Sequence, residues 1–281
     1  MRKDAAMCTI DGCGHHAKMP PIRVSQTDRR AFLAGMASLP LATVLAFPEL
    51  AHAQAQRLEP LTIPLPQGGE AQGVVAMPAK LPAPAVVLIH EWWGLNDQIK
   101  AVAAELANLG YIAYAIDLYG GKVAKTAEEA RALTQGLDAN AATAQLAGAI
   151  AHLKGDANST GKVATMGWCF GGGWSLNASI ATPVDATVIY YGRVNRGADD
   201  LKALSGPVLG HFGTLDKNIN ATMVSGFEAA MAQAGKADLL TVHWYEADHA
   251  FANPTGARYD AEDAALAWTR TTDFLAANLK G

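Results

Sequence analysis

Residues 167–173 read Gly-Trp-Cys-Phe-Gly-Gly-Gly, and they directly follow a strand-like run, Lys-Val-Ala-Thr-Met, at 162–166. The order strand, Gly-x-nucleophile-x-Gly, helix is typical of a nucleophile elbow, a strained turn that exposes its central side chain above a sheet. The flanking glycines are needed because side chains there would meet neighbouring backbone. Cysteine stands where serine is more usual, so the stretch predicts Cys169 as a nucleophile.

Cysteine is chemically suited to this position because the attacking form is the thiolate. The positive end of the helix that follows favours ionisation of the thiol. A serine hydroxyl would need a base to remove its proton during attack, whereas a thiol is already partly ionised near neutral pH. On residues 167–173 alone, a glycine-rich turn around an inert buried cysteine is the alternative interpretation.

The N-terminal segment has the features of an export signal. Paired arginines occur within Thr-Asp-Arg-Arg-Ala-Phe-Leu at 27–33, as in a Tat signal, and an apolar run follows at 31–47. Ala-His-Ala at 51–53 supplies small residues for cleavage. The apolar run is short for a membrane span, and Pro40 interrupts it.

We therefore expect a leader at 1–53, recognised by the Tat export machinery, and a folded domain at 54–281 that works in the periplasm. An N-terminal anchor that is never cut is the alternative. After cleavage, the domain is expected to have no stable association with the membrane. The formal net charge is −4 at pH 7 and no basic run follows residue 54, so nucleic acid is not an expected partner.

The cysteine content restricts the chemistry of the predicted domain. Only Cys169 lies after residue 53, so no disulfide within that domain is possible. Near the N-terminus, Cys8, Cys13, His15 and His16 superficially resemble a metal site. Their place upstream of the paired arginines favours a long leader instead. We expect neither a metal nor an organic cofactor.

The chain after residue 54 alternates strand-like and helix-like segments. Strand-like runs occur at 61–65, 73–77, 85–89, 111–116, 162–166, 186–191, 207–210 and 239–245, the first two as an antiparallel hairpin. Helical periodicity is found at 99–109, 127–153 with a break near Gly136, 227–234 and 261–279. Strands separated by helices predict a single α/β domain, with a mostly parallel sheet and helices on both faces. No segment is long enough for a separate cap domain, so we expect an open cleft shaped by loops.

Four side chains with catalytic chemistry follow strand-like runs, namely Glu91, Cys169, Asp216 and His249. The carboxyl ends of parallel strands meet at one edge of a sheet, so these side chains are expected to converge there. The order nucleophile, acid, histidine is that of hydrolases with open α/β sheets. We expect His249 to act as the base and Asp216 to fix its orientation.

Other residues compete for the roles of base and orienting acid. Asp248 adjoins His249, but sequence neighbours rarely orient each other's side chains well, which favours Asp216. His211 immediately follows a buried strand-like run and could line the cleft. His243 lies within a strand-like run and is expected to be packed or surface-facing. An incidental loop histidine is the alternative interpretation of His249.

The loop His-Glu-Trp-Trp-Gly at 90–94 is expected to complete the site. In this architecture it donates one oxyanion-hole amide and the residue after the nucleophile donates the other, which assigns the backbone N–H groups of Trp92 and Phe170. A carboxylate opposes ionisation of a nearby thiol, so Glu91 is expected to hold the thiol neutral at rest or to relay its proton. A surface position is the alternative for Glu91. The aromatic residues Trp92, Trp93 and Phe170 either line the cleft or belong to the core.

Together these motifs resemble those of the dienelactone hydrolases, enzymes of the α/β-hydrolase fold with a Cys-His-Asp triad. The matching stretches are Ile-His-Glu-Trp-Trp-Gly at 89–94, Gly-Trp-Cys-Phe-Gly-Gly at 167–172, Gly-Thr-Leu-Asp at 213–216 and Asp-His-Ala-Phe at 248–251. They extend in the right order over essentially all of the predicted domain. The resemblance implies Cys169 as nucleophile, His249 as base, Asp216 as orienting acid and Glu91 as a modulator of the thiol.

One position departs from the family pattern. Members that act on dienelactone carry an arginine four residues after the histidine, which binds the substrate carboxylate, and here that residue is Asn253. Asparagine donates hydrogen bonds but lacks the charged, bidentate fork of arginine. Arg131, in the helical region after residue 127, is a candidate for a second carboxylate-binding arginine. With Trp93 and Phe251, these residues are the candidate substrate contacts.

The expected function is therefore that of a hydrolase that opens lactones or cleaves activated esters through a thioester on Cys169. Its partner is a small-molecule lactone or ester. A general exported carboxylesterase is the nearest alternative, because Asn253 replaces the family arginine. A catalytically silent binding protein of the same fold is the other alternative, and the complete order of Glu91, Cys169, Asp216 and His249 argues against it.

Overall fold

The structure is a computed structural model that describes residues 41–281. The paired arginines, Pro40 and the group Cys8, Cys13, His15 and His16 lie outside the described residues. Within residues 41–281, no helix is long and apolar enough to cross a membrane.

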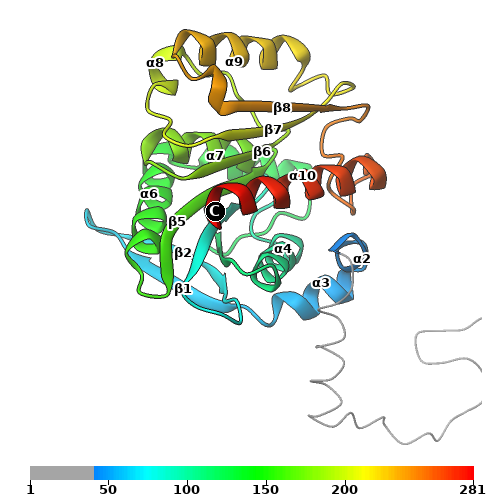
Figure 1. The fold of residues 1–281 in the computed structure, drawn as a ribbon. Helices are drawn as coiled ribbons and strands as arrows, with labels where there is room; N and C mark the ends of the chain where they lie inside the picture. The colour runs from blue at the N-terminus through cyan, green and yellow to red at the C-terminus, as the bar shows by residue number, and fades with distance from the viewer. Residues whose placement is uncertain (1–40) are drawn as a thin grey trace, which may run out of the picture.

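An eight-stranded sheet forms the centre of the molecule (Figure 1). The strands are β1 (Glu59–Pro64), β2 (Glu70–Ala76), β3 (Ala83–Ile89), β4 (Ile112–Ile116), β5 (Ser159–Trp168), β6 (Ala186–Tyr190), β7 (Val208–Gly213) and β8 (Leu240–Tyr245). Their order across the sheet is β1-β2-β4-β3-β5-β6-β7-β8. Strand β2 is antiparallel to both of its neighbours, β1 and β4, and the six strands from β4 to β8 across the sheet are parallel to one another. The predicted hairpin and the mostly parallel sheet are confirmed.

Helices cover both faces of the sheet because side chains of the central strands alternate between two apolar layers. Val86 and Leu88 of β3 pack in one layer, and Val87 and Ile89 of the same strand pack in the other. The helices are α2 (Leu41–Ala46), α3 (Pro48–Ala55), α4 (Asp97–Asn108), α5 (Ala127–Gly136), α6 (Ala139–Gly155), α7 (Phe170–Ala181), α8 (Ala198–Leu201), α9 (Ala221–Gln233) and α10 (Ala261–Leu279). Helices α4 and α10 cover the first layer and α6 covers the second (Figure 1). This arrangement is the expected α/β-hydrolase fold.

Local sequence signals explain where several helices begin. The predicted break near Gly136 is present, and α6 begins after Asp138, whose Oδ1 accepts hydrogen bonds from the N–H groups of Asn140 and Ala141 at 2.8 and 3.1 Å. Helix α9 begins earlier than predicted, because Asn220 caps it by accepting from Met223 N at 3.1 Å.

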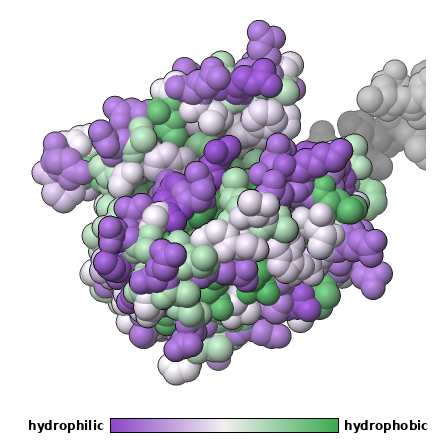
Figure 2. Space-filling view, turned by 90° about the horizontal axis from the view of Figure 1, so that it is seen from above, coloured by the Kyte–Doolittle hydropathy of each residue, from purple (hydrophilic) through white to green (hydrophobic). Residues whose placement is uncertain are grey.

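On the face that Figure 2 shows, polar residues prevail and apolar residues lie in small separate groups.

Helix α2 precedes the predicted domain boundary, helix α3 spans it, and both pack against α4. The expected cleavage point after Ala53 falls inside α3, where Ala51 and Gln54 are only 1 % and 3 % exposed. The imidazole Nδ1 of His52 lies 2.7 Å from Asp97 Oδ2, at the first residue of α4. The described fold therefore begins before residue 54, and the division into a leader at 1–53 and a domain at 54–281 stays a prediction.

Candidate active site

Cys169 lies on a strained turn between β5 and α7. Its φ is 53°, in the left-handed region, and its N–H donates to Tyr190 O at 2.9 Å, which ties the turn to β6. A Cβ on Gly167 would overlap the backbone of Gly171, and a Cβ on Gly171 would overlap Ile89 O. The glycine pattern is thus explained by close backbone contacts around the cysteine.

His249 connects the cysteine to a buried carboxylate. Its Nε2 lies 3.1 Å from Cys169 Sγ, and its Nδ1 lies 2.6 Å from Asp216 Oδ2. The other oxygen of Asp216 accepts from the N–H groups of Asn218 and Ile219 at 2.7 and 3.0 Å, which fixes the carboxylate. The three side chains come from three loops at the carboxyl ends of β5, β7 and β8, as the sequence predicts.

The electrostatics of the three groups favour a charged pair. Burial alone would raise the pKa of Asp216, but hydrogen bonds from His249 and from Ile219 N lower the pKa below its usual value. Burial would lower the pKa of His249, but the partners Asp216 and Cys169 raise the pKa to about 10. The imidazolium form is therefore stabilised when the sulfur is a thiolate, so the arrangement can hold a nucleophile ready for attack.

The competing residues have other roles. Asp248 Oδ1 accepts from the backbone N–H of His249 at 2.6 Å, so its carboxylate holds the loop and not the ring. His211 is fully buried away from the cleft, between Tyr245 Oη at 2.8 Å and Thr271 Oγ1 at 2.9 Å. Burial lowers the pKa of His211 to about 3, so this ring is neutral. Of the histidines considered, His249 is the one beside the thiol.

Glu91 is buried and bonded to two neighbours, so the alternative of a surface glutamate is wrong. It is 6 % exposed; Asn253 Nδ2 donates to Oε2 at 2.7 Å, and the Tyr191 hydroxyl donates to Oε1 at 3.4 Å. Burial raises the pKa of Glu91. Among the described residues, the thiol of Cys169 is hydrogen-bonded to His249 and not to Glu91.

The loop after β3 is held by His90, a residue whose role sequence reasoning missed. His90 is fully buried; its Nε2 accepts from Leu118 N at 3.2 Å, so its Nδ1 carries the proton that it donates to Glu91 O at 2.6 Å. In a trans peptide the C=O and the next N–H point in opposite directions. Because Glu91 O points into the core, the N–H of Trp92 points away from the core. Phe170 opens α7, so its N–H has no partner within the helix.

Tyr191 is a second residue that the sequence did not reveal. It directly follows β6 in the left-handed region, with φ 37°, and its N–H donates to His211 O at 2.8 Å. Its ring packs edge-on against His249, with ring centroids 5.2 Å apart, while its hydroxyl reaches Glu91. Tyr191 thus contacts both the histidine and the buried glutamate, and it orients both.

A cleft of about 820 Å³ opens above the cysteine. Trp92, Trp93 and Phe170 line it, so these aromatic residues form a cleft wall as well as packing locally. Asn253 also lines the cleft. Phe251, by contrast, is fully buried and packs against Tyr191 and Tyr245.

Positive charge reaches the cleft from positions that sequence reasoning missed. Arg193, Arg196 and Arg258 line it, and Arg196 is held by Asn177 Oδ1, which accepts from its Nε at 2.8 Å. Arg131 lies exposed on α5 and is not among the residues that line the cleft. This geometry does not support the prediction that Arg131 is a second carboxylate-binding arginine.

Comparison with known proteins identifies the family. The model of the dienelactone hydrolase family matches residues 71–279. A carboxymethylenebutenolidase of Pseudomonas putida is 34% identical over 218 residues, which cover 72% of this chain and 89% of that protein. Carboxymethylenebutenolidase 1 of Cupriavidus pinatubonensis is 27% identical over 74% of this chain and 92% of its own length.

Solved structures show the same fold. A dienelactone hydrolase-like promiscuous phosphotriesterase from metagenomic libraries has a TM-score of 0.70 at 24% identity, with 79% of this chain and 99% of that chain covered. At this identity the likeness concerns the fold alone. With the family match over 71–279 and the curated relatives, the chain belongs to the dienelactone hydrolase family and is a hydrolase of ester or lactone bonds.

Proposed function

We propose that the protein opens lactones of the dienelactone type, or cleaves activated esters, through a thioester on Cys169. The observation that carries the proposal is the position of His249, which lies 3.1 Å from Cys169 Sγ and 2.6 Å from Asp216 Oδ2. A nucleophile, a base and an orienting acid in this order need no further group for acyl transfer. Cys169, His249 and Asp216 are called the triad below.

Acylation begins when the thiolate of Cys169 attacks the carbonyl carbon and a new C–S bond forms. The oxyanion is stabilised by the backbone N–H groups of Trp92 and Phe170. On collapse the bond from the carbonyl carbon to the ester oxygen breaks, and the imidazolium of His249 returns its proton to the departing oxygen. His249 then removes a proton from water, and the resulting hydroxide attacks the thioester. The carboxylic acid leaves and the thiolate is restored.

Buried Glu91 is proposed to modulate this cycle. An ionised carboxylate close to the cleft opposes formation of the thiolate, whereas a protonated one does not. Burial raises the pKa of Glu91, while the hydrogen bond from Asn253 favours its charged form. The side chain of Asn253 is therefore proposed to tune the charge of Glu91.

The arginines of the cleft support a substrate with an anionic group. Arg193, Arg196 and Arg258 line the same cavity as Cys169, in a chain whose formal net charge is −4. Arg196 is held in place by Asn177, so its guanidinium is pre-organised. We propose that these residues take over the binding of a carboxylate from the family arginine that Asn253 replaces.

A general carboxylesterase is the second candidate function. The observation that favours it is again Asn253, whose amide is engaged with Glu91 at 2.7 Å and brings no charge to the cleft. A neutral ester would suit a site in which the family's carboxylate contact is missing. A silent binding protein is opposed by the short contacts within the triad.

The decisive experiment follows dienelactone loss by ultraviolet absorbance for the full chain and its Cys169→Ala variant. Cysteine-dependent turnover at substrate concentrations well below millimolar supports a lactone hydrolase. Turnover of an aryl acetate through Cys169 without turnover of dienelactone supports the carboxylesterase. Failure of both, with an iodoacetamide reactivity of Cys169 no greater than that of a free thiol, would reject both hydrolase functions.

We further propose that the Tat machinery exports the protein and that it works in the periplasm. The paired arginines at 27–33 and the apolar run at 31–47 support this proposal. Immunoblots of fractionated cells test it, with an Arg29→Lys, Arg30→Lys variant as the control. Equal distribution of both proteins in the cytoplasm would reject export.

A further inference from the structure

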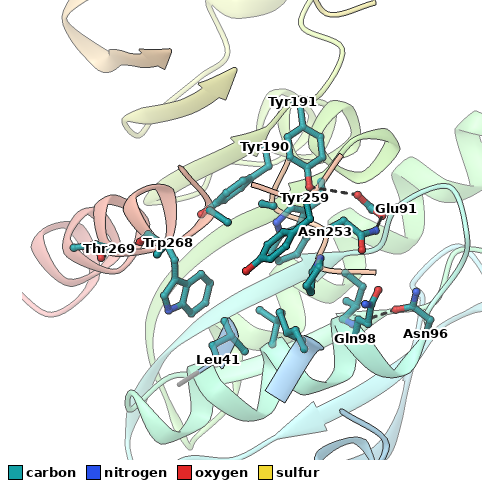
Figure 3. Close-up of a pocket in the computed structure, with 18 residues that line it drawn as sticks. Leu41, Glu91, Asn96, Gln98, Tyr190, Tyr191, Asn253, Tyr259, Trp268 and Thr269 are labelled. Carbon is teal, nitrogen blue, oxygen red and sulfur yellow. Dashed lines mark hydrogen bonds between the residues drawn. The ribbon is translucent and has the colours of Figure 1, made fainter. Parts of the chain in front are cut away.

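A second cavity lies on the far side of Glu91 from the thiol. It has a volume of about 240 Å³ and is bounded by α4, α10, α2 and the carboxyl ends of β5 and β6. Figure 3 shows Trp268 toward one end and Glu91 with Asn253 toward the other. Nothing in the catalytic cycle proposed above uses this space.

The walls of this cavity are mostly apolar. They come from three helices, with Ile99 and Val102 on α4, Ala264 and Trp268 on α10, and Leu41 and Leu45 on α2. Of the polar lining residues, Glu91 and Asn253 also line the catalytic cleft, whereas Thr269 lies beside Trp268 at the other end. A mostly apolar cavity whose carboxylate lies on the side of the catalytic cleft suits a ligand with a polar head and a hydrocarbon tail.

Three side chains separate this cavity from the catalytic cleft. Glu91, Tyr191 and Asn253 line both spaces, so they form a partition one side chain thick. The partition is held by the 2.7 Å hydrogen bond from Asn253 to Glu91 and by the longer one from Tyr191 at 3.4 Å. The cavity therefore adjoins the place where the acyl group of a substrate would lie.

We propose that the 240 Å³ cavity binds the hydrocarbon part of the substrate, which is an alkyl substituent on a lactone or the acyl chain of an ester. The inference rests on the proposed function, because the chain must be attached to a carbonyl carbon that Cys169 attacks. The hydrocarbon chain enters when the hydrogen bond from Asn253 to Glu91 breaks and the side chain of Asn253 rotates away from the partition. Acetate and other short groups stay in the cleft and do not need this movement.

The size of the cavity sets the length of the chain. An apolar cavity of about 150 Å³ holds a benzene molecule, so the larger volume here takes a chain of roughly six to eight carbons. Asparagine at position 253 makes the partition easier to open than the family arginine would. An arginine would form a charged pair with Glu91, and a charge-assisted bond is roughly twice as strong as a neutral one.

The cavity as described belongs to the uncut chain, because Leu41 and Leu45 form one wall and lie before the predicted cleavage point after Ala53. The test therefore uses the full chain, with p-nitrophenyl esters from acetate to octanoate. In the wild type, kcat/KM is expected to rise by up to fourfold per added methylene, which corresponds to the ~0.8 kcal/mol of burying one methylene group. Ala264→Phe and Val102→Phe fill the cavity from opposite walls. Each is expected to lower the octanoate-to-acetate ratio of kcat/KM by at least about tenfold.

A matched variant controls for the added ring. Ala276→Phe introduces the same side chain on an exposed position of α10 that does not line the cavity, and the octanoate-to-acetate ratio should stay at the wild-type value. Asn253→Ala should raise the ratio, because it removes the hydrogen bond that closes the partition. A chain-length profile that Ala264→Phe and Val102→Phe leave unchanged would overturn the proposal.

Binding without turnover separates failure of this inference from failure of the proposed function. Trp168 and Trp268 line the cavity, so 1-octanol bound there should shift the tryptophan emission to shorter wavelength in a saturable manner, even in Cys169→Ala. A saturable shift that Ala264→Phe abolishes supports the cavity as a hydrocarbon site, whatever the esterase assay gives. A shift that is absent, that does not saturate, or that Ala264→Phe leaves unchanged, overturns it.

Discussion

Asn253 donates a hydrogen bond of 2.7 Å to Glu91, a residue 162 positions earlier in the chain. The bond joins the loop after β8 to the loop after β3, and it lies beside the triad. In this way one substitution relative to the family pattern changes three things together. It alters the charge of the cleft, the environment of Glu91 and the strength of the partition.

Restoring the family arginine should shift specificity toward anionic lactones. In Asn253→Arg, the guanidinium can bind a substrate carboxylate, and we expect kcat/KM for dienelactone to rise about tenfold relative to a neutral aryl acetate. The ratio of the two kcat/KM values is the measurement. Asn253→Lys is the control, because it adds the charge without the bidentate fork and should give a smaller gain. An unchanged ratio in both variants would mean that the other arginines already bind the carboxylate.

Removing the charge of Asp216 should disable the base while leaving the fold intact. In Asp216→Asn the amide cannot stabilise the imidazolium of His249, so kcat is expected to fall about 10³–10⁴-fold at neutral pH. The pKa of His249 should fall from about 10, because Asp216 is one of the groups that raise it. Ultraviolet absorbance of the thiolate against pH measures this loss of the charged pair. A thiolate titration identical to that of the wild type would contradict the proposed pairing.

The raised pKa of His249 also predicts a stability that depends on pH. In the folded protein the pKa lies at about 10, against an ordinary value of 6.5, so the folded state binds the proton more tightly. The stabilisation is fully present below about pH 6.5 and is lost as the pH rises toward about 10. Urea unfolding across this range should show the difference in unfolding free energy between wild type and His249→Gln shrinking with pH. A difference that grows over the same range would be inconsistent with the direction of the shift.

Local pattern made part of the site predictable. Cys169, Asp216 and His249 each follow a strand-like run, and the carboxyl ends of parallel strands must meet, so their proximity followed from the sequence. The glycines around Cys169 have the same local origin, since the backbone contacts that exclude a side chain are formed by the turn itself and by β3.

The rest depended on tertiary contacts that carry no local signal. Tyr191 has a φ in the left-handed region and a hydrogen bond to Glu91, which lies 100 positions earlier in the chain. The residues around Tyr191 in the sequence predict neither feature. Arg193 and Arg258 lie in loops, and no sequence motif around them predicts that they line the cleft. Phe251 sits in a motif beside His249 yet points into the core, because motif membership does not fix the direction of a side chain.

His90 should affect the rate of the chemical step more than substrate binding. In His90→Leu, Glu91 O loses the shorter of its two hydrogen bonds and keeps only the one from Gly94 N at 3.2 Å, so the N–H of Trp92 is less firmly oriented. We therefore expect kcat to fall about 10–100-fold with KM little changed. Steady-state kinetics on an aryl acetate measure the two parameters separately. His90→Gln should restore part of kcat, since its amide can donate to the same oxygen. An equal loss in KM, or no rescue by glutamine, would point to a merely structural role.

Two glycines in different settings provide a matched test of the elbow. In Gly171→Ala the new Cβ would overlap the backbone oxygens of Ile89 and His90, so the elbow must shift and both activity and folding should suffer. We expect the free energy of unfolding to fall by several kcal/mol, in the range of overpacking and backbone strain. Gly226 lies in α9 with open space around it, and Gly226→Ala should raise the free energy of unfolding by about 0.5–1 kcal/mol. Denaturant unfolding of the two variants checks the opposite signs, and a Gly171→Ala protein with wild-type stability and kcat would show that the backbone contacts at the elbow can relax.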